Sequence, residues 1–438
     1  MVLLLLSAAL LLAGLAVERI RLDRSRAAIP LRVTVTGTRG KTTVVRLLAS
    51  VLREGGRAVL AKTTGSEPCL VLPDGTVEPI RRRGRASILE QIALLHRGAR
   101  LGVDAVVAEV MSIHAENHLV ESRRILVPQM VLVTNFRVDH TEAAGDTPEG
   151  VAALLALDVP EGAAVFVPEA EALPSFQAAV EGLAPGRPGG LERTCVVEVP
   201  SGTAAPLFSE SGEGLDAFAE NLDLVVAAAR FLGLDDATIR RGVERARHDV
   251  GALRIWKVAS APGASDAGDA RSRPGKPGPA YLVNAFAAND PASTMEIHGR
   301  VMAALTSGSG APRGGTDEGV PPCVGLLSLR ADRGDRTLQW ADALGSGLLE
   351  RFDVLLVTGL HAAALARRVR AVARRTGRVC GSDVRVVPPA SAPELTRRAV
   401  SELGAPGGVV FGFGNIGGVG RELIEHWSRT GEAVAHGH

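Results

Sequence analysis

The chain has 438 residues, a formal net charge of +1 and only 3% aromatic residues. This length leaves room for two core-forming domains and additional segments. A near-neutral charge and few aromatic rings exclude the basic footprint and the stacking surfaces of nucleic-acid-binding proteins, so no nucleic-acid partner is expected. The four cysteines show no C-x-x-C spacing, which indicates reduced cysteines rather than a disulfide framework or a zinc site.

The N-terminus predicts a membrane anchor over residues 1–18. Residues 2–17 are apolar except for Ser7, and as a helix they would span about 24 Å, slightly less than a hydrocarbon core of about 30 Å. The arginines that follow this run are Arg19, Arg21, Arg24 and Arg26. A cleaved signal peptide, the alternative, carries its positive charges before the apolar run. Because the charges follow it here, we predict a single-pass helix in the plasma membrane with the remaining chain in the cytoplasm.

A nucleotide-binding loop follows the anchor. The β-branched run from Val33 predicts a buried strand, two glycines break it, and an amphipathic helix follows from Lys41 to about Arg53. In such units the backbone N–H groups and the helix N-terminus bind phosphate, the lysine reaches the outer phosphates and the next hydroxyl holds Mg²⁺. The full pattern has glycine where this chain has Val35, so the loop is shortened. We therefore predict ATP and Mg²⁺ as cofactors. The predicted nucleotide contacts are Gly37, Thr38, Arg39, Gly40, Lys41, Thr42 and Thr43, with Thr42 also a metal ligand.

Two further polar segments follow predicted strands. The segment E-V-M-S begins at Glu109, after the apolar strand 105–108, and T-N-F-R-V-D-H covers residues 134–140, after the strand 130–133. Open α/β sheets bind their ligands at the carboxyl ends of the strands. Taken singly, each segment could supply only capping or turn residues. Their order behind a phosphate loop predicts one composite site.

Two α/β domains are predicted. From residue 30 to about residue 250, apolar strands alternate with helical stretches, the pattern of a parallel sheet with crossover helices. A second unit, residues 251–438, repeats this alternation, and its predicted strands are 280–284, 323–328, 354–358, 384–387 and 408–411. Two stretches rich in Gly, Pro, Ser, Asp and Arg, residues 261–279 and 307–322, are predicted to be flexible insertions.

Three segments of the second unit carry chemically informative residues. Residues 283–291 read V-N-A-F-A-A-N-D-P. The charged loop after strand 323–328 supplies substrate candidates, because arginine is the usual fork for carboxylate or phosphate; a solvated loop is the alternative. These candidates are Arg330, Arg333 and Arg336. Residues 412–417 read G-F-G-N-I-G, where a tight turn is favoured over a dinucleotide fingerprint, since the fingerprint needs a further strand. A backbone nest for a substrate carboxylate is the functional alternative.

Together these segments resemble the Mur ligase family, which includes the folylpolyglutamate synthases. T-G-T-R-G-K-T-T resembles the family's ATP site, and E-V-M-S and T-N-F-R-V-D-H resemble its E-x-S-S and T-N-x-x-x-D-H segments. V-N-A-F-A-A-N-D-P is similar to its V-D-x-Y-A-H-N-P segment. The complete order, anchor included, resembles one branch, the ligase subunits of poly-γ-glutamate synthases (the PgsB or CapB type). The resemblance implies a P-loop Mur-ligase-like central ATPase domain and a smaller Rossmann-like C-terminal domain.

The resemblance also assigns roles to residues. The implied catalytic residues are Lys41, Glu109 and His140, and the implied metal ligands are Thr42, Glu109 and His140. Two further nucleotide contacts are implied, Asn221 on the adenine side and Asn284 in the second unit. For Asn221, a capping or solvent-facing role is the alternative.

One departure concerns the second metal. The Mur enzymes hold it with a carbamylated lysine, but this chain has no lysine between Lys62 and Lys257. What replaces the carbamate is left open. We therefore expect Mg²⁺ dependence without a bicarbonate requirement.

These residues predict a carboxylate–amine ligase. The sequence shows no Ser-His-Asp or Cys-His pair that would indicate a protein nucleophile. A phosphate loop with additional metal ligands instead favours attack of a substrate carboxylate on the γ-phosphate of ATP. The acyl phosphate would then react with an amine. The family implies glutamate and the growing polyglutamate as substrates, a γ-linkage, and companion membrane subunits as partners. Glutamate stereochemistry and homo-oligomerisation stay open.

Two alternatives belong to other classes. One is a membrane-tethered P-loop ATPase that powers or gates polymer export without forming an amide bond. The other is a small-molecule kinase, which would release a stable phosphorylated product. Hydroxylamine trapping distinguishes them, since only an acyl phosphate yields a hydroxamate.

Overall fold

The computed structural model describes the chain in two compact units. Described are residues 1–65, 68–82, 84, 86–138, 145–183, 191–208, 219–246, 253–259, 278–288, 290–307, 321–330, 334–375, 383–404 and 407–434. Those up to residue 246 belong to the first unit and those from residue 253 onward to the second. The predicted boundary at 250/251 lies outside the described residues, as do most of the two predicted insertions.

The first unit is built on an eight-stranded sheet in the order β4-β3-β2-β5-β1-β6-β7-β8. Its strands are β1 (Leu31–Thr36), β2 (Val59–Thr63), β3 (Cys69–Val71), β4 (Val77–Pro79), β5 (Ala105–Glu109), β6 (Met130–Val133), β7 (Ala164–Pro168) and β8 (Cys195–Val199). Strands β2, β5, β1, β6, β7 and β8 run parallel, whereas β3 and β4 add an antiparallel edge beside β2. The central strands consist almost entirely of buried residues, as expected for a parallel sheet covered on both faces.

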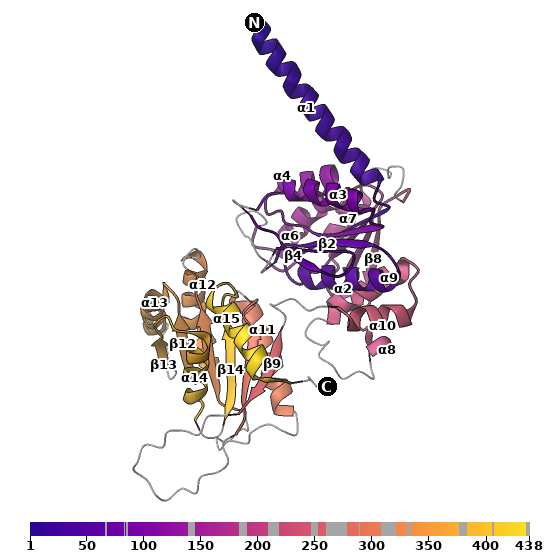
Figure 1. Ribbon diagram of the computed structural model, residues 1–438. Coiled ribbons are helices and arrows are strands. Elements are labelled where there is room, and N and C mark those ends of the chain that lie inside the picture. Colours follow the sequence, from indigo (N-terminus) through magenta and orange to yellow (C-terminus); the bar gives the residue numbers. More distant parts are fainter. Residues whose placement is uncertain are drawn as a thin grey trace, which may run out of the picture. The chain divides into compact units, whose positions relative to one another are not determined.

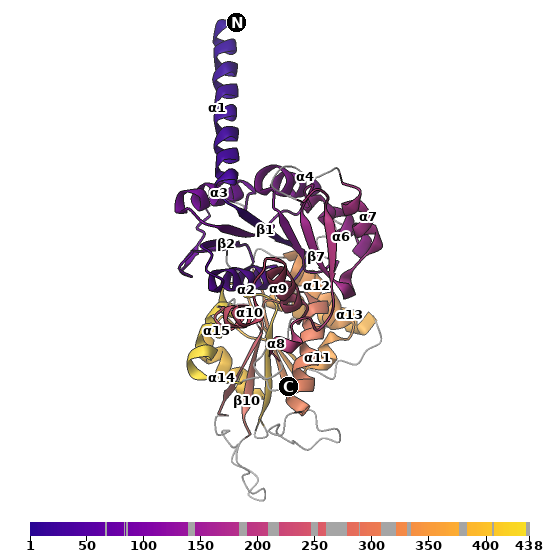
Figure 2. The same cartoon turned by 90° about the vertical axis from the view of Figure 1, so that its right-hand side faces the viewer.

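Helices cover both faces of this sheet (Figure 2). On one face α2 packs on β1, β2 and β5, while α9 packs on β7 and β8 and α10 packs on α2. These helices are α2 (Lys41–Glu54), α9 (Ala219–Phe231) and α10 (Asp236–Glu244). The opposite face carries α3 (Leu89–Leu101), α4 (Ala115–Val120), the π-helical η1 (Glu121–Leu126), α6 (Pro148–Leu155), the 3₁₀ turn η2 (Ala156–Asp158) and α7 (Pro174–Glu181). Short elements η3 (Glu169–Glu171) and α8 (Ala205–Phe208) complete the unit. The phosphate loop thus leads from a buried strand directly into α2.

The N-terminal helix α1 (Val2–Ala27) projects from the first unit (Figure 1). It is long and apolar enough to cross a membrane, and none of its most apolar window is buried. The helix continues beyond the predicted anchor, because charge pairs such as Arg19–Asp23, four residues apart, favour helix in the polar segment. Its last turns pack on the unit: Leu22 is buried, and Ser25 Oγ lies 2.8 Å from His96 Nδ1 of α3.

The second unit is a seven-stranded sheet in the order β13-β12-β11-β14-β10-β9-β15. Its strands are β9 (Arg254–Val258), β10 (Ala280–Ala285), β11 (Cys323–Ser328), β12 (Val354–Thr358), β13 (Asp383–Val386), β14 (Gly408–Phe413) and β15 (Glu432–Ala433). All five predicted strands are present and parallel; β9 and β15 add an antiparallel edge. One core cluster contains residues of α11 (Pro291–Ser307), α12 (Gly334–Gly345), η5 (Leu348–Arg351) and α13 (Ala362–Arg375). The other contains residues of α14 (Ala392–Glu402) and α15 (Val419–Thr430).

Candidate active site

The phosphate loop lies at the carboxyl end of β1, in the middle of the first sheet. Gly37 and Gly40 have φ angles of 122° and 83°, a region that glycine adopts without strain. A side chain at Gly37 would also collide with Thr134, whose Oγ1 lies 2.1 Å from the position of a Cβ. Lys41 folds back over the loop, and its Nζ donates to the carbonyl oxygen of Gly37 at 2.7 Å. The lysine therefore lies directly beside the loop that would bind phosphate.

Asn135, at the carboxyl end of β6, holds the loop in shape. Its Oδ1 accepts hydrogen bonds from Thr38 Oγ1 at 2.6 Å and from the backbone N–H of Arg39 at 3.2 Å. Its Nδ2 donates to the carbonyl oxygen of Arg39 at 3.1 Å. The sequence motifs assign no role to Asn135, although it belongs to a Thr-Asn pair that directly follows a predicted strand.

Glu109 ends β5, the strand beside β1, and its carboxylate contacts the residue after Lys41. Glu109 Oε2 accepts from Thr42 Oγ1 at 2.9 Å and from the backbone N–H of Thr64 at 2.7 Å, and its side chain is 3% exposed. A hydroxyl and a carboxylate this close are the hard oxygen donors that Mg²⁺ prefers. Within the described part of the chain, no group of three or more His, Cys, Asp or Glu could hold a metal. The pair therefore fits a metal whose shell is completed by other ligands, such as phosphate oxygens and water.

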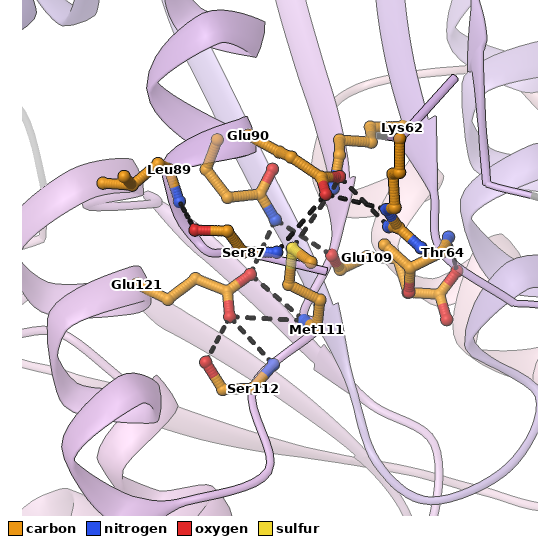
Figure 3. A network of polar contacts seen from close by, with 11 residues as sticks. Lys62, Thr64, Ser87, Leu89, Glu90, Glu109, Met111, Ser112 and Glu121 are labelled. Atoms are coloured by element: carbon orange, nitrogen blue, oxygen red, sulfur yellow. Dashed lines mark hydrogen bonds and ion pairs between the residues drawn. The ribbon is translucent and has the colours of Figure 1, made fainter. Parts of the chain in front are cut away.

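A buried polar network supports the segment that follows Glu109 (Figure 3). Glu121 of η1 is fully buried and accepts from the backbone N–H groups of Met111 and Ser112 at 3.1 and 3.0 Å. Ser112 Oγ donates to it at 2.5 Å, and Gln91 Nε2 at 2.6 Å. Gln91 Nε2 also donates to the carbonyl oxygen of Glu109 at 3.2 Å. Burial raises the pKa of Glu121. This network fixes the backbone that carries Glu109.

Lys62 of β2 lies in the same network (Figure 3). Its side chain is 1% exposed, and its Nζ lies 3.2 Å from Glu90 Oε2 and 3.4 Å from Met111 Sδ. Arg82 Nε donates to the other oxygen of Glu90 at 2.8 Å. Burial lowers the pKa of Lys62, and the Glu90 carboxylate works in the opposite direction. Lys62 thus has a carboxylate partner of its own and braces β2 against α3.

Asp158 of η2 joins three elements behind the phosphate loop. It is fully buried and accepts from Thr36 Oγ1 at 2.6 Å and from Ser122 Oγ at 3.0 Å, while His118 Nδ1 lies 2.8 Å from its Oδ1. Thr36 is the last residue of β1, directly before Gly37. The carboxylate therefore ties the end of the loop-bearing strand to α4 and η1.

The structure places Asn221 against the phosphate loop. Asn221 is 5% exposed on α9, and its Nδ2 lies 2.6 Å from the position that a Cβ on Gly40 would take. Gly40 is thus required by close packing as well as by its φ angle. The predicted contact of Asn221 with the adenine base stays a prediction.

The remaining predicted residues belong mainly to the second unit. Asn284 is fully buried on β10, and its Oδ1 accepts from the backbone N–H of Phe286 at 3.3 Å. Arg330 is exposed, and its Nη1 lies 3.1 Å from the position of a Cβ on Gly417, so this arginine lies against the glycine-rich segment. Arg336 is half-buried on α12. His140 of the first unit and Arg333 lie outside the described residues.

Two domain families match this chain. Residues 35–163 match the Mur ligase middle domain, and residues 271–430 match the poly-gamma-glutamate synthase CapB C-terminal domain. PGA synthase CapB of Bacillus subtilis (strain 168) is 27% identical over 97% of this chain and 96% of that protein. Capsule biosynthesis protein CapB of Bacillus anthracis is 30% identical over 72% of this chain, which spans 60% of that protein.

Solved structures share the fold at low identity. E. coli FolC in complex with ADP has a TM-score of 0.60 at 16% identity, covering 94% of this chain and 92% of FolC. The bifunctional folylpolyglutamate synthase/dihydrofolate synthase of Yersinia pestis complexed with AMPPNP and Mn ion has a TM-score of 0.58 at 15% identity, covering 94% and 92%. MurF of Acinetobacter baumannii reaches 0.53 at 14% identity, covering 93% and 79%.

The chain is a Mur-ligase-like protein, an ATP-dependent amide ligase by class, and the predicted α/β fold is confirmed. Within that class it belongs with the CapB-type poly-γ-glutamate synthases, as the order of its motifs predicted.

Proposed function

We propose that this chain is an ADP-forming carboxylate–amine ligase that makes poly-γ-glutamate. The observation that best supports this proposal is the Thr42–Glu109 pair beside a phosphate loop, in a Mur-ligase-like unit followed by a CapB-type domain. The relatives named PGA synthase CapB and capsule biosynthesis protein CapB support the polymer as the product.

The side chains of the first unit account for the activation step. The N–H groups of the loop and the ammonium of Lys41 would offset charge on the γ-phosphoryl group of ATP. A substrate carboxylate oxygen attacks the γ-phosphorus, the bond to the ADP oxygen breaks, and an acyl phosphate forms. The contact between Cys323 Sγ and His298 Nε2 supplies no competing nucleophile, because it is buried in the second unit and burial raises the pKa of the thiol.

We assign Mg²⁺ as the divalent metal. Thr42 and Glu109, with His140, would hold it, and when bound it supplies Lewis-acid stabilisation of phosphoryl transfer. The Yersinia pestis relative of similar fold was crystallised with AMPPNP and Mn ion, which supports a nucleotide with a divalent cation.

The role of His140 is tested by its alanine variant. We expect His140→Ala to raise the Mg²⁺ concentration for half-maximal activity, because an imidazole ligand is lost, and wild-type activity to need no bicarbonate. If His140 only caps a turn, the variant would instead lose about 1 kcal/mol of stability and little activity. Mg²⁺ activation curves recorded beside melting temperatures separate the two outcomes.

The membrane assignment follows from α1. We propose that α1 anchors the enzyme in the plasma membrane with both units in the cytoplasm, where ATP is available, and that companion membrane subunits bind there and receive the polymer. Its apolar window is wholly exposed, whereas Leu22 and Ser25 pack on the first unit.

Removal of residues 2–17 is therefore expected to give a soluble protein that still binds ATP, since the truncation leaves Leu22 and the Ser25–His96 contact in place. Nucleotide affinity within about two-fold of the full-length protein in detergent supports this boundary. A further truncation through residue 27 should destabilise the unit, because it removes a buried leucine, at about 2 kcal/mol or more. Loss of ATP binding without aggregation in the shorter truncation would show that the apolar run belongs to the fold.

Hydroxylamine trapping tests the proposed reaction against the export-ATPase and kinase alternatives. The full-length protein, with ATP, Mg²⁺ and glutamate or oligo-γ-glutamate, is expected to release ADP and form a hydroxamate. ATP hydrolysis without hydroxamate would favour the export ATPase, and a stable phosphorylated product would favour the kinase.

A further inference from the structure

The first unit contains a buried histidine–aspartate pair that the proposed mechanism does not yet use. His118 of α4 is 3% exposed and Asp158 of η2 is fully buried, with 2.8 Å between His118 Nδ1 and Asp158 Oδ1. Thr36 and Ser122 donate their hydroxyl hydrogens to the same carboxylate. Because a carboxylate only accepts, Nδ1 must carry a hydrogen, which fixes the orientation of the ring; Nε2 carries a second hydrogen when the imidazole is in its charged form.

This arrangement leaves the second ring nitrogen for a ligand. Among the described residues, none forms a hydrogen bond with His118 Nε2. Nε2 is thus left without a protein partner in the part of the chain that the structure describes, although the residue is almost completely buried. A nitrogen held in this way, with a fixed hydrogen-bond partner behind it, is preorganised to contact a bound molecule.

The imidazole ring of His118 is linked to the phosphate loop through Asp158. Asp158 binds both His118 and Thr36, and Thr36 directly precedes Gly37, whose carbonyl oxygen accepts from Lys41. Three charged groups act on the imidazole: Asp158 and Glu121, which favour its charged form, and Lys41, which opposes it. Burial opposes the charge most strongly, but the two carboxylates outweigh it and the pKa of His118 is raised. Lys41 and His118 thus both lie near the loop.

We propose that His118 Nε2–H binds the substrate carboxylate that ATP phosphorylates. This inference rests on the proposed ligase function. In that reaction His118 would bind the terminal carboxylate of glutamate or polyglutamate. Lys41 would bind the phosphates of ATP. The reaction requires one further anion beside the γ-phosphate, the substrate carboxylate, and His118 would bind it. A charged imidazole is a suitable partner, because charge-assisted hydrogen bonds are the stronger ones.

One carboxylate oxygen stays hydrogen-bonded to Nε2–H while the other forms a bond to the γ-phosphorus and ADP leaves with the electron pair of the broken P–O bond. His118 keeps its proton throughout. The amine then attacks the acyl carbon, the C–O bond to phosphate breaks, and the amine proton leaves with the phosphate.

The His118→Gln variant tests the proposal in the full-length protein. Hydroxamate formation is measured against the concentration of glutamate or oligo-γ-glutamate, and ATP affinity is measured separately. We expect the KM for the carboxylate to rise at least about ten-fold, because a charged hydrogen bond is lost, and the affinity for ATP to stay within about two-fold. His96→Gln is the matched control, since that histidine binds Ser25 of α1 and should leave both values unchanged.

The pH dependence separates binding from a purely structural role. In the wild type, the KM for the carboxylate should rise as pH increases through the raised pKa of His118, and this dependence should be absent in His118→Gln. Asp158→Asn retains an acceptor for Thr36 but removes the charge that raises the pKa of His118, so its KM should begin to rise at lower pH. If His118→Gln unfolds, this second variant carries the test.

A structural brace would lower the melting temperature and kcat without altering the pH dependence of KM. A wild-type KM and pH profile in folded His118→Gln, or an unshifted profile in Asp158→Asn, would overturn the inference while the ligase function stands. Absence of hydroxamate from the wild-type protein would instead overturn the proposed function and this inference with it.

Discussion

The Lys41→Ala variant is expected to lose ATP turnover by at least about 10²- to 10³-fold while remaining folded and membrane-associated. Lys41 places its ammonium on the phosphate loop, 2.7 Å from the Gly37 carbonyl oxygen, and a preorganised charge at a transferring phosphoryl group contributes to catalysis on this scale. The side chain is half-buried, so the truncation removes one hydrogen bond, about 1 kcal/mol of stability. ADP release and hydroxamate formation measure the loss.

The matched control for this variant is Lys257→Ala. Lys257 is exposed on β9 of the second unit, and its removal should leave turnover and melting temperature unchanged. Full ATPase activity in purified Lys41→Ala would remove the phosphate loop from the mechanism. Loss of activity together with a large fall in melting temperature would mean that Lys41 supports the fold rather than the phosphates.

Motifs contained in one short segment were predictable from the sequence. The loop residues from Gly37 to Thr43 and the acidic residue Glu109 each directly follow an apolar strand. Because β1 and β5 are neighbours in a parallel sheet, residues at their carboxyl ends must lie close together, and Thr42 and Glu109 do. Neither segment gives the strand order that makes them neighbours, which only the folded structure supplies.

Residues that act through partners distant in the chain gave no such signal. Asp158 binds Thr36 across 122 positions, and it stands in a stretch that reads only as the end of a helix. Glu121 and Gln91 likewise reach the segment after Glu109 from other elements. A buried carboxylate in a π-helical turn has no periodic pattern in the sequence. Such supporting residues become visible only when the packing is known.

The end of α1 could not be predicted from hydropathy alone. Hydropathy places the end of the anchor near residue 18, since the apolar run stops there. The helix nevertheless continues to Ala27, because Asp23 pairs with both Arg19 and Arg26 along one face and Leu22 finds a place in the core. A hydrophobic span and the helix that contains it need not have the same limits.

The Glu109→Gln variant is expected to require at least about ten- to a hundred-fold more Mg²⁺ for half-maximal activity. Glutamine has the same size and keeps one oxygen to accept from Thr64, so the loop and β5 should retain their positions. What it loses is the negative charge beside Thr42 Oγ1, and a hard divalent cation binds a neutral amide oxygen more weakly than a carboxylate. Metal titrations at saturating ATP, with the melting temperature recorded in parallel, measure the effect.

Two comparisons decide what Glu109 does. Glu244→Gln, an exposed position on α10, serves as the control for the loss of one carboxylate and should behave as the wild type. Glu109→Asp keeps the charge but shortens the side chain, so it should restore part of the metal affinity if charge is the main contribution. An unchanged Mg²⁺ midpoint with a reduced kcat in Glu109→Gln would contradict a metal-ligand role. Glu109 would then act only by holding Thr42 and the Thr64 backbone in place, and the metal would bind to the phosphates through other groups.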